Sequence, residues 1–87
     1  MARLSFTPNL ARLVACPEGD WAGRTVGEVL DAAFRERPGA RGYVLDEHGR
    51  VRKHIQIFVD GARLADRDRL TDPAGAHVFV LQALSGG

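Results

Sequence analysis

Cysteine, lysine and long hydrophobic runs are scarce in this 87-residue sequence, and their scarcity excludes several classes of protein. Cys16 is the sole cysteine, so neither an internal disulfide nor a cysteine-rich metal site can form. No hydrophobic run approaches the roughly 20 residues of a membrane span. The N-terminal segment also lacks the apolar stretch of a signal peptide. We therefore expect a cytoplasmic protein with no membrane partner.

A block of charges of one sign is missing as well. The 12 Lys and Arg residues nearly balance the 11 Asp and Glu residues, and the two signs are interleaved along the chain. Because a protein that follows a phosphate backbone needs a basic patch, we expect no nucleic acid partner. Eleven of the basic residues are arginine, so Lys53 is the only side chain through which a lysine-linked polymer could form.

What remains is the composition of one small globular domain. Hydrophobic residues make up 45% of the sequence and charged residues 26%, as in ordinary folded proteins. A chain of 87 residues lies near the lower limit for folding without disulfides or metals. It has room for a thin core but not for a deep catalytic cavity.

The N-terminal part predicts a β-hairpin. Residues Ala2 to Thr7 alternate, with Leu4 and Phe6 on one side, which is typical of a half-buried strand. A Thr-Pro-Asn turn follows, and Arg12 to Cys16 then resembles a second strand, which Pro17 ends.

One helix is predicted with a clear start and end. Thr25 and Glu28 form a capping box, in which the threonine accepts a free backbone N–H and the glutamate reaches back. Pro38 and Gly39 end the helix. Its apolar residues fall at helical spacing on one stripe: Val26, Val29, Leu30, Ala33 and Phe34.

The following segment predicts a second hairpin. Tyr43-Val44-Leu45 is expected to form a short turn or strand. Val51 to Val59 alternates and predicts a strand, and Asp60-Gly61 directly after it is a strong two-residue hairpin signal. Ala62 to Leu64 can pair back only briefly.

The sequence ends in a predicted central strand. Asp72 to Gly75 indicates a turn, and His77 to Leu84 is apolar on both faces, which is typical of a strand inside a sheet. The resulting order is strand, strand, helix, strand, short strand and strand. Such an order, with one helix across a single face, predicts a two-layer α+β domain.

This order, together with three short segments, resembles the β-grasp fold of ubiquitin and, more closely, the ThiS/MoaD family of sulfur carrier proteins. The segments are Ile57 to Gly61, Asp72-Pro73 and Gln82 to Gly87. The resemblance implies a mixed sheet of four to five strands with one main helix packed across one face. It places this domain at residues 1–84 and a flexible C-terminal tail at residues 85–87.

The resemblance also implies where the chemistry occurs. In the family, a ubiquitin-activating-type enzyme uses ATP to adenylate the terminal carboxylate, here that of Gly87. A sulfur donor then converts it to a thiocarboxylate, which supplies a sulfur-accepting biosynthetic enzyme. Leu84, Ser85 and Gly86 would thread into the partner, because glycine has no Cβ to clash in a narrow channel. No bound cofactor is expected beyond this covalent thiocarboxylate.

A docking surface is predicted on the open side of the sheet. If Val78 and Val80 face the helix, then Phe79 and Leu81 face away from it, and the hairpin register places Phe58 beside them. These three side chains form a candidate partner-docking patch. The alternative is that the loop from residue 43 to residue 46 covers them.

Three functional hypotheses follow. The first is a sulfur carrier that is a protein co-substrate and not an enzyme, because no residue group is suited to acid–base or nucleophilic catalysis. The second is a ubiquitin-like modifier joined through Gly87 to lysines of other proteins. The third is an interaction domain with an inert tail. The residues directly before the two terminal glycines, Gln82 to Ser85, differ from those at the same place in molybdopterin-type members. Cysteine, thiamine, thiolated RNA and secondary metabolites remain open as end products.

The remaining reactive side chains are assigned no site. His48, His54 and His77 lack the spacing of metal ligands, so no metal is expected. Cys16 is expected to be a small buried hydrophobic residue. Trp21 is expected to seal an edge of the core.

Overall fold

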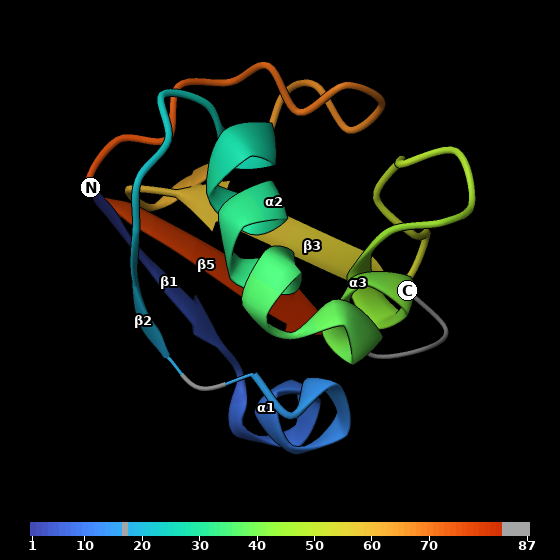
Figure 1. Ribbon diagram of the computed structural model, residues 1–87. Helices are drawn as coiled ribbons and strands as arrows, with labels where there is room; N and C mark the ends of the chain where they lie inside the picture. Colours follow the sequence, from blue (N-terminus) through green and yellow to red (C-terminus); the bar gives the residue numbers. More distant parts are fainter. Residues whose placement is uncertain (17, 83–87) are drawn as a thin grey trace.

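The computed structural model describes residues 1–16 and 18–82, which form a mixed five-stranded sheet with its helices on one face (Figure 1). The order of strands across the sheet is β2-β1-β5-β3-β4. This architecture confirms the predicted α+β, β-grasp-like class. The strands are β1 (Ala2–Phe6), β2 (Gly19–Trp21), β3 (Ile55–Val59), β4 (Ala62–Arg63) and β5 (His77–Gln82).

The two strands from opposite ends of the chain lie side by side in the middle of the sheet. β1 runs parallel to β5, with Leu4 beside Val78 and Phe6 beside Val80. All four of these side chains are buried. The prediction that the last strand is central is therefore confirmed over residues 77–82, whereas residues 83 and 84 lie outside the described part.

The predicted N-terminal hairpin is wrong. Residues Pro8–Val14 form a helix, α1, and the antiparallel partner of β1 is the later strand β2. Proline at the first helical position has a backbone already suited to the helix. Leu10 and Val14, four residues apart, bury one face of α1, while Leu13 is 50% exposed. The apparent strand pattern was therefore part of a helix.

The predicted main helix is confirmed as α2 (Val26–Glu36). Thr25 Oγ1 accepts a hydrogen bond from Glu28 N at 3.2 Å, and Glu28 Oε1 accepts one from Arg24 N at 2.8 Å. The glutamate thus reaches one residue further back than in the usual capping box. The predicted apolar stripe is fully buried: Val26, Val29, Leu30, Ala33 and Phe34.

A third helix replaces the turn or strand expected at residues 43–45. α2 ends at Glu36, before Pro38, as predicted. After Arg37, however, Pro38 begins a new helix, α3 (Pro38–Val44). Ala40 and Val44 of α3 are buried, and Leu45 beyond it is also in the core. α3 lies on the same face of the sheet as α2 (Figure 1).

The second hairpin is confirmed at its turn, but the strand before it is shorter than the predicted residues 51–59. β3 begins only at Ile55, because residues 53 and 54 form a turn and Val51 makes an isolated bridge to Leu45. Asp60 and Gly61 have φ angles of 50° and 86°, the positive values that a tight two-residue hairpin needs at both positions. β4 pairs with β3 only through Arg63 opposite Phe58 and Ala62 opposite Val59. β3 therefore has β5 as its long partner.

Candidate functional site

The predicted reactive end of the chain follows β5 in the sequence. Gln82 is the last described residue and is opposite Ile55, the first residue of β3. The residues predicted to carry the chemistry lie outside the described part of the chain: Leu84, Ser85, Gly86 and Gly87.

The predicted docking residues do meet on the face opposite the helices. Phe58 of β3 is directly opposite Phe79 of β5, and Leu81 lies two residues further along β5 on the same face. All three are partly exposed, whereas the alternating Val78 and Val80 are fully buried on the helix side. We call Phe58, Phe79 and Leu81 the open-face patch.

Two residues that were not predicted from the sequence, His77 and Gly61, also border the open-face patch. His77 and Gly61 line the same shallow hollow of about 440 Å³ as the three patch residues. The centroids of the His77 and Phe79 rings are 6.0 Å apart. His77 precedes Phe79 by two residues in β5, so strand alternation alone could have placed it on this face.

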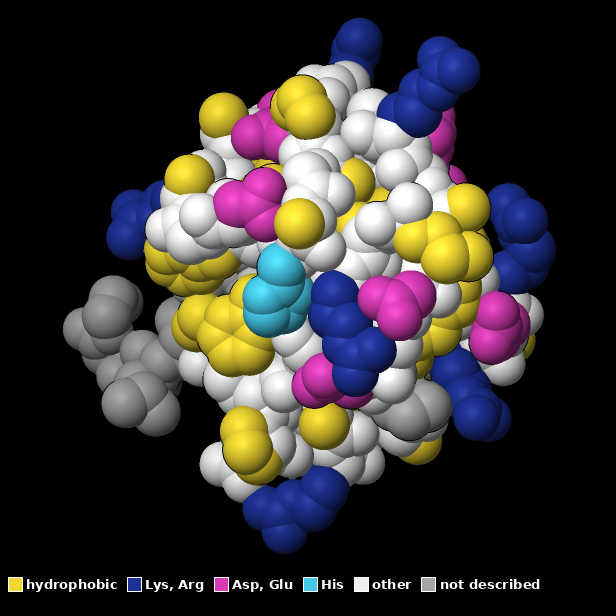
Figure 2. All heavy atoms as spheres, turned by 90° about the vertical axis from the view of Figure 1, so that its left-hand side faces the viewer, with side chains coloured by type: hydrophobic (Ala, Val, Ile, Leu, Met, Phe, Trp, Pro, Cys, Tyr) yellow, Lys and Arg dark blue, Asp and Glu magenta, His cyan; other side chains and the backbone are white. Residues whose placement is uncertain are grey.

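Polar groups from β1 and β2 adjoin the patch. A hydrogen bond joins Ser5 Oγ to His77 Nε2. Beside it, Arg3 donates to Glu18 at 2.6 Å and to Asp20 at 3.2 Å, and these contacts raise the pKa of Arg3. Figure 2 shows hydrophobic side chains beside a histidine, with basic and acidic groups next to them. The surface is thus an apolar centre with a polar border.

The alternative that a loop covers the patch is wrong. The residues proposed as that cover belong to α3 and the segment after it, which lie on the helix face. Val44 and Leu45 point into the core there, and Tyr43 is 45% exposed.

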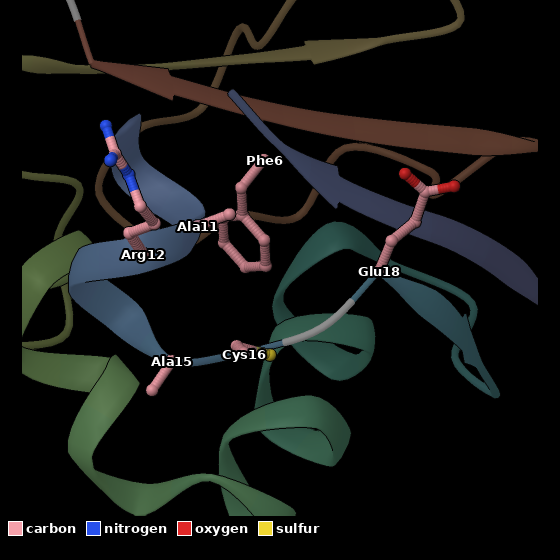
Figure 3. Close-up of a pocket in the computed structure, with 6 residues that line it drawn as sticks. All are labelled: Phe6, Ala11, Arg12, Ala15, Cys16 and Glu18. Carbon is pink, nitrogen blue, oxygen red and sulfur yellow. The ribbon is translucent and has the colours of Figure 1, made fainter. Parts of the chain in front are cut away.

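A second hollow, of about 400 Å³, lies between α1, the end of β1 and the segment before β2. Figure 3 shows the Phe6 ring directed into it, with Arg12 and Glu18 on opposite sides. Arg12 donates to Asn9 at 2.6 Å, and Glu18 accepts from Arg3. The charged groups at this hollow are thus already engaged with neighbouring side chains.

Cys16, which also lines the second hollow, is 1% exposed, and burial raises the pKa of its thiol. It fits the small buried residue that the sequence predicts. Trp21 packs against the core from β2, as expected, and its indole Nε1 donates to Glu36 at 3.0 Å.

Two other features are absent from the described residues. No cluster of three or more His, Cys, Asp or Glu side chains suited to a metal ion occurs among them. None of the helices in the same residues is both long and apolar enough to cross a membrane.

The chain was compared with known proteins. No protein-family model and no curated protein matches its sequence. Solved structures do match. SAMP1 from Haloferax volcanii is 25% identical, with a TM-score of 0.74, and the match covers 99% of this chain and 98% of that one.

Two further structures match over nearly the whole length. A chain of the BexX/CysO complex from Amycolatopsis orientalis is 19% identical, with a TM-score of 0.81 and full coverage of both chains. CysO from Mycobacterium tuberculosis is 17% identical, with a TM-score of 0.77, covering 97% of this chain and 100% of that one. These matches confirm the β-grasp fold and the resemblance to ThiS/MoaD-type ubiquitin-like proteins.

Proposed function

We propose that this chain is a sulfur carrier, a protein co-substrate whose Gly87 carboxylate is loaded and unloaded by other enzymes. The observation that carries the proposal is the position of β5. This central strand is held between β1 and β3, and the sequence after its last residue, Gln82, is Ala-Leu-Ser-Gly-Gly. A rigid body thus leads directly into a segment that ends in two residues without side chains.

The chemistry of the carboxylate explains why a partner enzyme is needed. An α-carboxyl group has a reference pKa of about 3.5, so it is ionised at neutral pH and is a poor electrophile. Adenylation with ATP makes its carbonyl carbon reactive, and a sulfur donor then displaces AMP to leave the thiocarboxylate. The carrier itself supplies no acid, base or nucleophile in this scheme.

The open-face patch is proposed as the docking surface for the adenylating enzyme and for the enzyme that accepts the sulfur. Its three apolar side chains are rigidly placed on paired strands, and its border is polar, as in the centre and rim of protein interfaces. The BexX/CysO complex supports partner binding, because CysO has the same fold. We propose that this exchange takes place in the cytoplasm and supplies sulfur to a biosynthetic enzyme.

Protein modification is the second candidate function. One structural neighbour is named small archaeal modifier protein 1. A modifier would use the same adenylate but would transfer the Gly87 carbonyl to an amine instead of to sulfur.

Intact-protein mass spectrometry of the chain purified from its own cells tests the proposal. We expect a fraction of the molecules to carry one oxygen-to-sulfur exchange, located at Gly87. Deletion of Gly86 and Gly87 should abolish this species. It should also abolish the cellular phenotype that the full-length chain supports. If the phenotype survives that deletion and no exchange is seen in the full chain, the tail is inert and the carrier function is refuted.

A further inference from the structure

One row of side chains crosses the open face of the sheet from edge to edge. Ser5 of β1 is opposite Phe79 of β5, and Phe79 is opposite Phe58 of β3. Phe58 is in turn opposite Arg63 of β4. At the other edge, Glu18 directly precedes β2, so the antiparallel register of β1 and β2 places it beside Ser5. The row thus consists of an acid, a small hydroxyl residue, two aromatic residues and a base.

The two ends of this row carry opposite charge. At the β2 edge, Arg3 pairs with Glu18 at 2.6 Å and with Asp20 at 3.2 Å. One arginine against two carboxylates leaves this border with a net charge of −1, and all three side chains are about half exposed. At the β4 edge, Arg63 is exposed and forms no ion pair with any residue that the structure describes. The open face is therefore negative at one edge and positive at the other.

A row of this composition is complementary to its own reverse. A two-fold axis parallel to β5, the middle strand, would lay the row of a second copy across it in the opposite order. Glu18 of each copy would then meet Arg63 of the other. Phe58 would lie over Ser5, the smallest side chain of the row, and the two Phe79 rings would meet at the axis. Facing sheets pack with their strands nearly aligned and about 10 Å apart, which this arrangement allows.

We propose that the open face of the sheet binds the open face of a second copy of this chain, in a two-fold dimer whose ion pairs join Glu18 to Arg63. Five strands at a spacing of about 4.8 Å form a face only about 20 Å wide. Such a face buries less surface than a standard interface of about 1,600 Å², so the dimer is weak and reversible. The dimer covers the open-face patch until another protein displaces the second copy. Only the competition with an adenylating enzyme rests on the proposed function.

Sedimentation equilibrium of the purified full chain at low salt measures the dimer directly. We expect it to become the major species between about 10 μM and 1 mM, as suits a small interface. Raising the salt concentration should weaken it, because exposed ion pairs are screened. A chain that stays monomeric up to about 1 mM would overturn the inference.

Inversion of charge at one edge tests the ion pairs. The acidic variant is Arg63→Glu, and the basic variant combines Arg3→Glu, Glu18→Arg and Asp20→Arg, so that its internal ion pairs can form again. Each variant alone sets like charges against each other and should dimerise at least about tenfold more weakly than wild type. An equal mixture of the two should regain wild-type affinity within about threefold, since every edge then meets the opposite charge.

Arg35→Glu is the control for these variants, because it changes the net charge as Arg63→Glu does but lies on α2, on the helix face of the sheet. It should dimerise within about twofold of wild type. Equal weakening by this control, undiminished dimers of both edge variants, or no recovery in their mixture would overturn the inference.

Cross-linking locates the axis. Leu81 lies on β5 and Gln56 is its register partner on β3, so both are on the open face, while the native Cys16 is 1% exposed. With diamide as oxidant, Leu81→Cys should form a disulfide between copies at least about tenfold faster than Gln56→Cys. Two cysteines at position 56 would be displaced by about 10 Å along the face, beyond the reach of a disulfide. Equal rates would overturn the two-fold arrangement.

The dimer and the carrier function fail separately. All these measurements use the chain alone, so a dimer with no oxygen-to-sulfur exchange at Gly87 would refute the proposed function and uphold this inference. Exchange at Gly87 in a chain that never dimerises would do the reverse.

Discussion

At the scale of single residues, aspartates organise the loops around the sheet. The carboxylate of Asp60, in the hairpin turn, accepts hydrogen bonds from Ala76 N at 3.2 Å and from His77 N at 2.9 Å. This contact ties the turn of one hairpin to the start of β5. Asp46 and Asp72 accept backbone N–H groups in the same way within their own loops. Aspartate carboxylates thus accept hydrogen bonds from backbone N–H groups of the loops, which have no partner in a neighbouring strand.

The Asp60 contact requires a glycine at position 75. A Cβ on Gly75 would lie 2.2 Å from Asp60 Oδ2, and its φ of 62° is strained for other residues. We expect Gly75→Ala to lower the free energy of unfolding by about 1–3 kcal/mol, measured by urea denaturation.

Gly42→Ala is the matched control, because a Cβ at this site in α3 would meet no atom within 4 Å. It should leave stability unchanged or raise it by up to about 1 kcal/mol. Equal stability of the two variants would contradict the role given to Gly75.

At the scale of elements, the Asp66 carboxylate organises residues 66–71 of the loop before β5. Asp66 accepts hydrogen bonds from Thr71 Oγ1 at 2.6 Å and from Arg69 N at 3.0 Å. The Thr71 hydroxyl and then the backbone N–H of Arg69 hold the pKa of Asp66 below its ordinary value of 3.8. This loop leads to Leu70, which is buried in the core.

The lowered pKa of Asp66 predicts an acid-sensitive loop. The unfolded chain takes up the proton first as the pH falls, so the stabilisation is complete above 3.8 and is lost as the pH falls through the lower folded-state pKa. We expect Asp66→Asn to be less stable than wild type at pH 7. The difference should shrink below pH 3.8, as followed by thermal unfolding across pH.

Asp68→Asn is the control, because Asp68 is exposed and its carboxylate accepts none of the hydrogen bonds that organise this loop. Its stability should follow the wild-type pH profile. A pH-independent difference between Asp66→Asn and wild type would argue against the assignment.

At the scale of the whole molecule, the sheet separates two kinds of surface. One face packs the three helices and encloses the core, and the other presents the open-face patch (Figure 1). β5 carries Phe79 and Leu81, and in the sequence it directly precedes the residues for which we propose the reactive carboxylate. In the proposed function, a partner docked on the open face would therefore lie next to the strand that leads into Gly87.

This arrangement predicts that the patch controls loading of Gly87. Phe58→Gln removes an apolar anchor from the open face, and we expect the oxygen-to-sulfur exchange at Gly87 to fall at least about tenfold in cells. Intact-protein mass spectrometry measures the exchange, and circular dichroism verifies the fold.

Tyr43→Gln is the matched control, since Tyr43 is an exposed aromatic residue on α3, away from the open face. Its loading should stay within about twofold of wild type. Similar losses in the two variants would show that the patch has no special part in docking.

The sequence by itself determined the elements whose signals lie between near neighbours. The Thr25–Glu28 cap, the apolar stripe of α2 and the two positive-φ residues at Asp60-Gly61 are local, so their positions could be predicted. Strand alternation likewise predicted the open-face patch, because successive side chains must point to opposite faces.

Only the tertiary structure decided α1, α3 and the pairing of the distant strands. Helices of seven residues are too short to be stable alone, so they form only because Leu10, Val14, Ala40 and Val44 are buried against the rest of the core. No local signal relates β1 to β5 or Ile55 to Gln82, since those partners are brought together by burial of the whole sheet. For that reason the neighbours of the open-face patch emerged only from the folded chain.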